Sequence, residues 1–355
     1  MRQITTWLLA AVLSLFALAA LAQSPQEPTQ QDRVKEQQQR AVTQPGNNAP
    51  VWRDVRGGPN PNAPYTTSSA RGRETEVLVQ SWGDTWRRIR NGPVTFYGGW
   101  LVLLVLAAIL GFYAVFGAVK LHDRPTGRLI PRFTRADQIV HWSVAISFCV
   151  LGLSGLIMFF GKHVLLPIVG YTLFGWLTAL SKNLHNFIAP FFIVSVIAMI
   201  VLYAKDNLPK AYDIKFLVNA FAVMAKGKHV PTGRFNGGEK LWFWGGVVIL
   251  SVIVTWSGLI LLFPNFDQTR HVMQEAWIWH ASAALLYVAI SFGHIYLGTI
   301  GLEGSYQAMR SGWVDETWAK EHHQIWYEEV KSGRRTRESS GGAVPAGAPH
   351  MEEKP

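Results

Sequence analysis

Residues 275–303 read EAWIWHASAALLYVAISFGHIYLGTIGLE, and this stretch decides the fold. Between Glu275 and Glu303 lie 27 uncharged residues, more than the roughly 20 that a helix needs to cross a hydrocarbon core of about 30 Å. The run also holds two histidines, His280 and His294. An ionisable side chain within a spanning helix is costly, so it usually faces a bundle interior for a functional reason. The stretch therefore predicts a membrane-spanning helix that carries two functional histidines.

Four further runs without charged residues predict four more spanning helices. With the first run, the helices are expected at about 98–119, 138–161, 183–204, 241–266 and 276–302. The composition agrees, because 49% of the residues are hydrophobic and only 16% are charged. We expect an all-α membrane protein, a transmembrane bundle whose four-helix core lies in a domain at 120–310. Residues 98–119 form one additional N-terminal transmembrane helix.

A sixth uncharged run, 163–181, carries Pro167, Gly170 and Gly175. If this run crossed the membrane, the seven Lys and Arg residues of 205–240 would face outward. The positive-inside rule argues against that orientation. The run is therefore predicted to be an interfacial or re-entrant piece on the outer surface.

The two ends of the chain are predicted to lie on opposite sides of a bacterial inner membrane. Residues 1–22 are typical of a signal peptide cleaved after Ala22, with an uncleaved anchor as the alternative. Residues 23–97 are rich in Gln, Pro, Asn and Gly and predict an extracytoplasmic, largely disordered arm. The basic residues of the loop 119–136 and of the tail 311–355 place that tail in the cytoplasm.

The single cysteine, Cys149, limits the chemistry that this chain can carry. One thiol cannot form an internal disulfide, a four-cysteine iron–sulfur site or a Cys-x-x-Cys-His attachment for haem. Any redox cofactor must therefore be held by other side chains, and iron–sulfur clusters would have to lie on a partner.

Four of the eleven histidines lie inside the uncharged runs, and they form two pairs by depth: His141, His185, His280 and His294. His280 and His294 are 14 residues apart, hence roughly 21 Å along one helix and within roughly 40° of the same face. His141 begins the second helix on the inner side, at the depth of His294. His185 begins the third helix on the outer side, at the depth of His280.

Two imidazoles at matched depth are suited to hold the iron of a b-type haem. The sequence thus predicts two haem b groups, an inner one on His141 and His294 and an outer one on His185 and His280. Taken singly, each histidine has the alternative of a satisfied core or interfacial residue, and a non-redox membrane anchor or a proton-relay transporter remains a rival. The other seven histidines are interpreted as surface residues, and the His322–His323 pair as lacking a surrounding metal-ligand cluster.

Several motifs resemble the gamma (cytochrome b556) subunit of respiratory formate dehydrogenase, within the wider group of di-haem cytochrome b membrane anchors. The resemblance covers roughly residues 130–330 and lies in the four histidines and in these stretches: Arg135-x-x-Gln138-x-x-His141-Trp142, Leu184-His185-Asn186-Phe187, Tyr203 with Asp206-Asn207-Leu208-Pro209, Arg234-Phe235-Asn236-Gly237-Gly238-Glu239-Lys240 and Trp318-Ala319-Lys320-Glu321-His322-His323-Gln324-x-Trp326-Tyr327. The signal peptide, the arm and the helix at 98–119 depart from the smaller members of that family.

The resemblance implies an electron-transfer subunit with no catalytic residues of its own. It implies quinone contacts by Asn236, Gly238 and His294, near the inner haem. It also implies two partners: an iron–sulfur beta subunit and a catalytic alpha subunit with molybdenum or tungsten, where formate is oxidised. A cytochrome b subunit of a membrane-bound hydrogenase or related dehydrogenase is the alternative, because the four-histidine scaffold is shared with those anchors.

Overall fold

The computed structural model describes residue 39 and residues 81–264, 266 and 268–334. The predicted signal peptide, the predicted arm up to residue 80 apart from residue 39, and residues 335–355 of the tail lie outside the described residues. The account below concerns residues 81–334.

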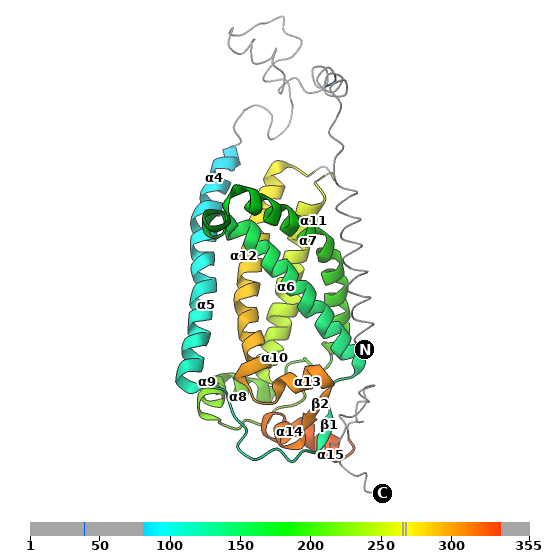
Figure 1. The fold of residues 1–355 in the computed structure, drawn as a ribbon. Helices are drawn as coiled ribbons and strands as arrows, with labels where there is room; N and C mark the ends of the chain where they lie inside the picture. Colours follow the sequence, from blue (N-terminus) through cyan, green and yellow to red (C-terminus); the bar gives the residue numbers. More distant parts are fainter. Residues whose placement is uncertain (1–38, 40–80, 265, 267, 335–355) are drawn as a thin grey trace, which may run out of the picture. The chain divides into compact units, whose positions relative to one another are not determined.

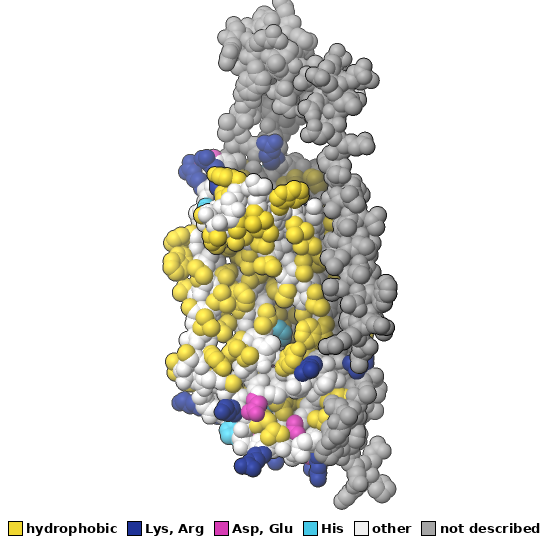
Figure 2. Space-filling view, viewed as in Figure 1, with side chains coloured by type: hydrophobic (Ala, Val, Ile, Leu, Met, Phe, Trp, Pro, Cys, Tyr) yellow, Lys and Arg dark blue, Asp and Glu magenta, His cyan; other side chains and the backbone are white. Residues whose placement is uncertain are grey.

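Within the described residues, five helices are long and apolar enough to cross a membrane: Trp82–Phe116, Arg135–Val164, Leu166–Tyr203, Gly237–Leu262 and Arg270–Gly301. Figure 1 shows them running between the same two ends of one bundle. Figure 2 shows hydrophobic side chains across the middle of the visible face, with Lys and Arg side chains gathered at its two ends. This distribution is typical of a bundle that presents an apolar belt to lipid.

The spanning helices are built from the following elements: α4 (Ser81–Ile89), η2 (Arg90–Val94) and α5 (Thr95–Phe116); α6 (Arg135–Val164); α7 (Leu166–Tyr203); α10 (Gly237–Leu241), η3 (Trp242–Leu250) and α11 (Ser251–Leu262); α12 (Arg270–Tyr296) and η4 (Leu297–Gly301).

Local chemistry fixes where α6 begins. The Thr134 hydroxyl accepts a hydrogen bond from the Asp137 N–H, while the Asp137 carboxylate accepts one from the Thr134 N–H. This reciprocal cap satisfies donors that the first turn of a helix leaves without a partner.

The core of the bundle is mostly apolar, and some of its buried serines bond within their own helices. Ser195 and Ser291 are buried, and each donates its hydroxyl to the carbonyl oxygen four residues earlier. The serine hydroxyls therefore cost little to bury. Helix α5 is different, because Leu103, Leu104 and Leu110 are exposed along it. It packs against α12 near Gly98, where an added Cβ would clash with the Leu285 side chain.

The end of the predicted arm is helical, which corrects the expectation of a disordered segment up to residue 97. Residues 81–97 form α4, η2 and the start of α5. The Trp86 ring lies edge-on to Trp277 of α12 with centroids 5.8 Å apart, and the Arg90 guanidinium lies over both rings. Trp86 therefore packs on the bundle itself.

The stretch 163–181 is also helical, and it forms no separate span. Helix α6 ends at Val164. Helix α7 begins at Leu166, so it contains the rest of the stretch, and it continues to Tyr203. Pro167 lies in the first turn of α7, where a proline needs no hydrogen-bond partner. Gly170 is the position that breaks helical geometry, with φ 75°. The predicted start at 183 misses the helical residues before it because the length of an uncharged run does not mark where a helix begins.

A folded cap covers the end of the bundle where α6 begins and α12 ends; we define it as residues 117–134, 205–236 and 302–334. Its strands are β1 (Leu129–Pro131) and β2 (Trp313–Asp315), and its helices are α8 (Ala211–Val218), α9 (Ala220–Lys226), α13 (Ser305–Ser311), α14 (Glu316–His322) and α15 (Gln324–Lys331) (Figure 1). The strands pair antiparallel with Ile130 opposite Val314, and both side chains are buried. Residues 311–334 of the predicted tail thus belong to a folded unit. We call the opposite end of the bundle the far end.

Candidate functional site

The four histidines of the spanning helices lie in two pairs, as their spacing predicted. The ring centroids of His141 on α6 and His294 on α12 are 6.2 Å apart. Those of His185 on α7 and His280 on α12 are 6.0 Å apart. The first pair lies towards the cap and the second towards the far end.

Both separations match two imidazoles on opposite sides of one metal ion. An imidazole bound at about 2.0 Å has its centroid roughly 3 Å from the metal, so two such rings lie roughly 6 Å apart. Rings that were packed only against each other could adopt other separations. The two separations therefore fit two bis-imidazole sites at two depths.

The far-end pair is held by two Ser-Gly dipeptides on neighbouring helices, which the sequence analysis did not single out. On α6, the Ser154 hydroxyl lies 3.0 Å from Nδ1 of His185, and a Cβ on Gly155 would lie 3.5 Å from the same ring. On α11, the Ser257 hydroxyl lies 3.3 Å from Nδ1 of His280, and a Cβ on Gly258 would lie 3.1 Å from that ring.

These contacts fix which nitrogen of each ring remains for a metal. Nδ1 of His280 also lies 3.0 Å from the carbonyl oxygen of Val254, to which an Nδ1–H donates. Such a bond from Nδ1 leaves the lone pair on Nε2, the arrangement that orients metal-binding imidazoles. In the sequence, the Ser-Gly dipeptide that recurs in two of the uncharged runs was the signal that could have indicated these contacts.

The cap-end pair is bordered by a stacked tryptophan, also missed in the sequence analysis. Trp242, the first residue of η3, lies parallel to His294, with ring centroids 4.9 Å apart and planes inclined by 14°. Nδ1 of His141 is buried without a hydrogen-bond partner among the described residues. The contact with Trp242 restrains the His294 ring by stacking.

Tyr287 lies between the two levels, seven residues from each histidine of α12. It is 3% exposed, its hydroxyl lies 3.0 Å from that of Ser251, and its ring contacts Phe148 at 4.6 Å and Trp242 at 5.7 Å. Aromatic side chains therefore fill the core between the two pairs of rings.

Comparison with known proteins agrees with this architecture. Residues 130–312, more than half of the chain, match the family described as prokaryotic cytochrome b561. The chain belongs to this cytochrome b561 family. The family match begins after α5, within strand β1, and it includes all four histidines.

Three relatives are subunits of formate dehydrogenases. The cytochrome b556(fdo) subunit of Escherichia coli K12 is 32% identical over 205 residues, which are 57% of this chain and 93% of that protein. The cytochrome b556(Fdn) subunit of the nitrate-inducible enzyme of the same strain is 28% identical over 225 residues, 61% of this chain and 98% of that protein. The cytochrome b556 subunit of Haemophilus influenzae is 27% identical over 213 residues, which are 57% of this chain and 83% of that protein. The resemblance noted in the sequence is thereby confirmed.

As a member of the cytochrome b561 family, the chain is a multi-pass membrane cytochrome, and the family implies haem b. The residues present fit that group. Imidazole is a common ligand of haem iron, and each pair of rings is separated by a distance that would let the two histidines hold one haem iron between them. The buried Nδ1 of His141 marks a ring whose polar atoms are not satisfied within the described protein.

The two non-histidine residues implied as quinone contacts lie at the start of the fourth spanning helix. Asn236 caps α10: its side-chain oxygen accepts hydrogen bonds from the N–H groups of Gly238 and Glu239, at 2.9 and 3.0 Å. Glu239 accepts one in return from the Asn236 N–H. Trp242 follows on the same helix and contacts His294, which links this helix start to the cap-end pair. The amide nitrogen of Asn236 is the group suited to a further partner.

The interpretation of the remaining histidines as surface residues is wrong for His323. This ring is 1% exposed, and its Nδ1–H donates to the Gly233 carbonyl oxygen over 2.8 Å. Burial, with the charge of Arg132 nearby, lowers the pKa of His323 well below its usual range, so the ring is neutral. The tail packs around it, which no local pattern in the sequence indicated.

Proposed function

We propose that this chain is the cytochrome b subunit of a membrane-bound formate dehydrogenase complex, which passes electrons through two b haems to a membrane quinone. The single observation that carries the proposal is the pair of bis-imidazole geometries at two depths. One pair alone would provide a redox site but not a path. Two pairs separated by roughly 21 Å of helix rise provide a path between the two sides of a membrane.

His185 and His280 are proposed to hold the outer haem iron, and His141 and His294 the inner one. When bound, haem b supplies a reversible one-electron carrier at each level. The Ser154 and Ser257 hydroxyls orient the outer rings from the Nδ1 side, and Trp242 orients the inner ring of His294. The aromatic core around Tyr287 excludes water between the levels.

The quinone site is proposed at Asn236, Gly238 and His294. The Asn236 amide can donate a hydrogen bond to a quinone oxygen, and Gly238 lets the quinone ring approach the backbone closely. The position at the start of the fourth helix lies on the side predicted to face the cytoplasm, so proton uptake there would separate charge across the membrane.

The partners are proposed from the relatives and from the single cysteine. The relatives are named as subunits of formate dehydrogenases, and one thiol cannot hold an iron–sulfur cluster. An iron–sulfur beta subunit and a molybdenum- or tungsten-containing alpha subunit would deliver the electrons of formate to the outer haem. We propose that the N-terminal arm lies in the periplasm and the tail in the cytoplasm of a bacterial inner membrane, because the loop 119–136 and the tail carry the basic residues.

The test is purification of the chain from its native membranes in mild detergent, followed by identification of the subunits that travel with it. Formate should reduce the haems of the purified complex, and added quinone should reoxidise them. Reduction by hydrogen but not by formate would favour the hydrogenase-type assembly. A preparation without a haem spectrum would refute the proposal in both forms.

A further inference from the structure

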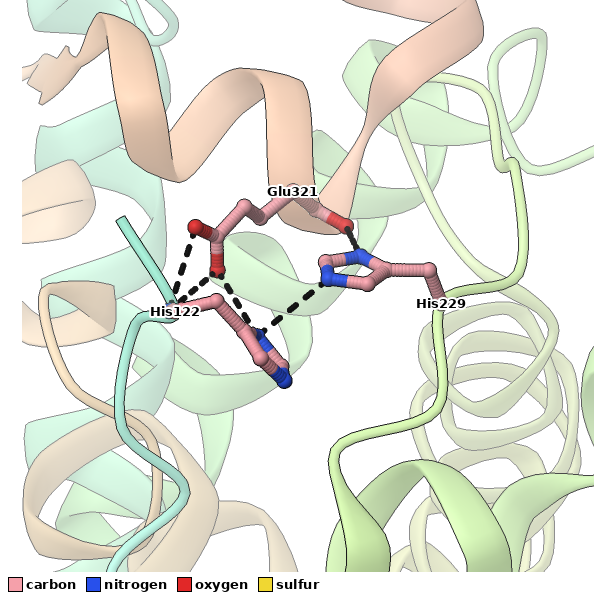
Figure 3. Close-up of side chains that lie close together, drawn as sticks. All are labelled: His122, His229 and Glu321. Carbon is pink, nitrogen blue, oxygen red and sulfur yellow. Dashed lines mark hydrogen bonds and ion pairs between the residues drawn. The ribbon is translucent and has the colours of Figure 1, made fainter.

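A cluster of two histidines and a glutamate lies in the cap, apart from the four histidines of the spanning helices. His122 comes from the loop between α5 and β1, His229 from the loop after α9, and Glu321 from α14 (Figure 3). One ligand atom from each residue lies within 4.8 Å of the other two. Three segments far apart in sequence thus bring together three side chains of the types that bind transition metals.

Two of the three distances in the cluster match those of a tetrahedral metal site. Nδ1 of His122 lies 3.2 Å from Nε2 of His229 and 3.4 Å from Oε2 of Glu321. With bonds of about 2.0–2.1 Å, two ligand atoms on a tetrahedral zinc ion are roughly 3.3 Å apart. Two of the three edges therefore already have the length that a metal would require.

The orientation of each group favours a metal as well. The Nδ1–H of His229 donates to the backbone carbonyl oxygen of Glu321 over 3.1 Å, which directs the Nε2 lone pair into the cluster. The Glu321 carboxylate, 6% exposed, is fixed by the backbone N–H groups of His122 and Asp123. Metal-binding imidazoles and carboxylates are typically held by outer hydrogen bonds of this kind.

We propose that His122, His229 and Glu321 bind one divalent transition-metal ion, zinc in the first instance, with water in the fourth position. Two imidazoles and a carboxylate form a ligand set that zinc accepts. The fourth position is open because the His122 side chain is 52% exposed. The ion ties the loop that follows α5 to α14 and to the loop after α9, so it stabilises the cap rather than taking part in electron transfer.

The experiment measures zinc in the full-length protein, purified in detergent with its haems and companion subunits through a tag that contains no histidine. The sample is treated with EDTA, incubated with Zn²⁺ alone and passed through gel filtration, and the metal is counted by mass spectrometry. The wild type is expected to retain one zinc ion per chain more than the variants His122→Gln, His229→Gln and Glu321→Gln. His163→Gln, which changes an exposed histidine at the far end, is the matched control and should retain the wild-type amount.

Haem content and elution volume show whether each variant is folded. X-ray absorption at the zinc edge of the wild type provides a measurement that needs no variant, and it should show two imidazoles among four N or O ligands at about 2.0 Å. Equal zinc in the wild type and in His229→Gln would overturn the proposal. A zinc shell without imidazole, or no zinc retained by the wild type, would overturn it as well and would leave a hydrogen-bonded cluster.

Discussion

Arg132 and Arg234 each donate a hydrogen bond to the backbone carbonyl oxygen of the other, over 2.8 and 3.0 Å. Both side chains are buried. Arg234 also pairs with Asp137 and Asp206. The pair joins the segment before α6 to the segment before α10. It therefore positions the start of α6, which carries His141, and the start of α10, which Asn236 caps.

Replacing Arg234 by Met should destabilise the cap strongly. The change leaves the Asp137 and Asp206 carboxylates without this cation, and loss of one partner from a buried ion pair costs about 3–5 kcal/mol. Thermal unfolding in detergent measures the loss. The control is Arg128→Met, because the exposed pair of Arg128 with Glu316 is worth at most about 1 kcal/mol. Equal losses of thermal stability in the Arg234 and Arg128 variants would contradict the role of Arg234 as a buried ion-pair partner.

Replacing His294 by Ala should remove one of the two proposed haems. The cap-end pair then has a single imidazole, whereas His185 and His280 are untouched. Haem content per chain, measured as the pyridine haemochrome, should fall by about half, since each haem needs both its axial imidazoles. His163→Ala serves as the control, and undiminished haem in the His294 variant would refute the ligand assignment.

Replacing Ser154 by Ala should raise the midpoint potential of the far-end haem. An Nδ1–H bond to the serine makes His185 a better donor and so favours oxidised iron. If that bond contributes about 1 kcal/mol, the shift is roughly 40 mV for a one-electron couple. A redox titration of the optical spectrum measures it. Ser147→Ala on the same helix, where the hydroxyl bonds only backbone carbonyls, should cause no such shift.

Adding a methyl group at Gly258 should disturb the far-end pair. The new Cβ would lie 3.1 Å from Cε1 of His280, so the ring has to move. Overpacking of this kind costs about 1–3 kcal/mol. We expect lower haem occupancy and an altered low-spin signal in electron paramagnetic resonance. Gly245→Ala is the matched change, since a Cβ there meets nothing within 4 Å; the same effect at both positions would disprove the steric explanation.

Replacing Asn236 by Ser should separate the two roles of that residue. A serine can still cap α10, whereas an alanine loses the cap at a cost of about 1 kcal/mol. The serine variant should therefore keep the stability of the wild type and lose most quinone reduction, because the amide donor is gone. Quinone reduction and inhibitor binding at wild-type levels in Asn236→Ser would count against the quinone assignment.

The sequence predicted the membrane bundle and the pairing of the four rings because both depend on regular helical spacing. His280 and His294 lie on one face whatever else the helix contacts, and charge placed His141 and His185 at the matching depths. What holds the rings could not be read in the same way. Ser154 and Ser257 reach histidines on other helices, and helical periodicity does not say which neighbour a serine faces.

The cap was missed for a different reason. Strands β1 and β2 have three residues each and lie about 180 residues apart in the chain, too short for either to show an alternating strand pattern. Arg132 is one of the basic residues of the loop 119–136, which indicate the cytoplasmic side, yet its guanidinium lies buried over Trp318 and Trp326. Long-range partners decided these environments.

Helix α12 supplies one ring to each level and Tyr287 between them, at intervals of seven residues along a single edge. A rotation of this helix about its axis would move both rings in the same sense. The two histidine pairs therefore share one helix, and a rotation of α12 cannot change the geometry of one pair without changing that of the other. In the proposed assembly with two haems, independent adjustment of the two potentials would come from the helices opposite, through Ser154 and Gly155 at one depth and Trp242 at the other.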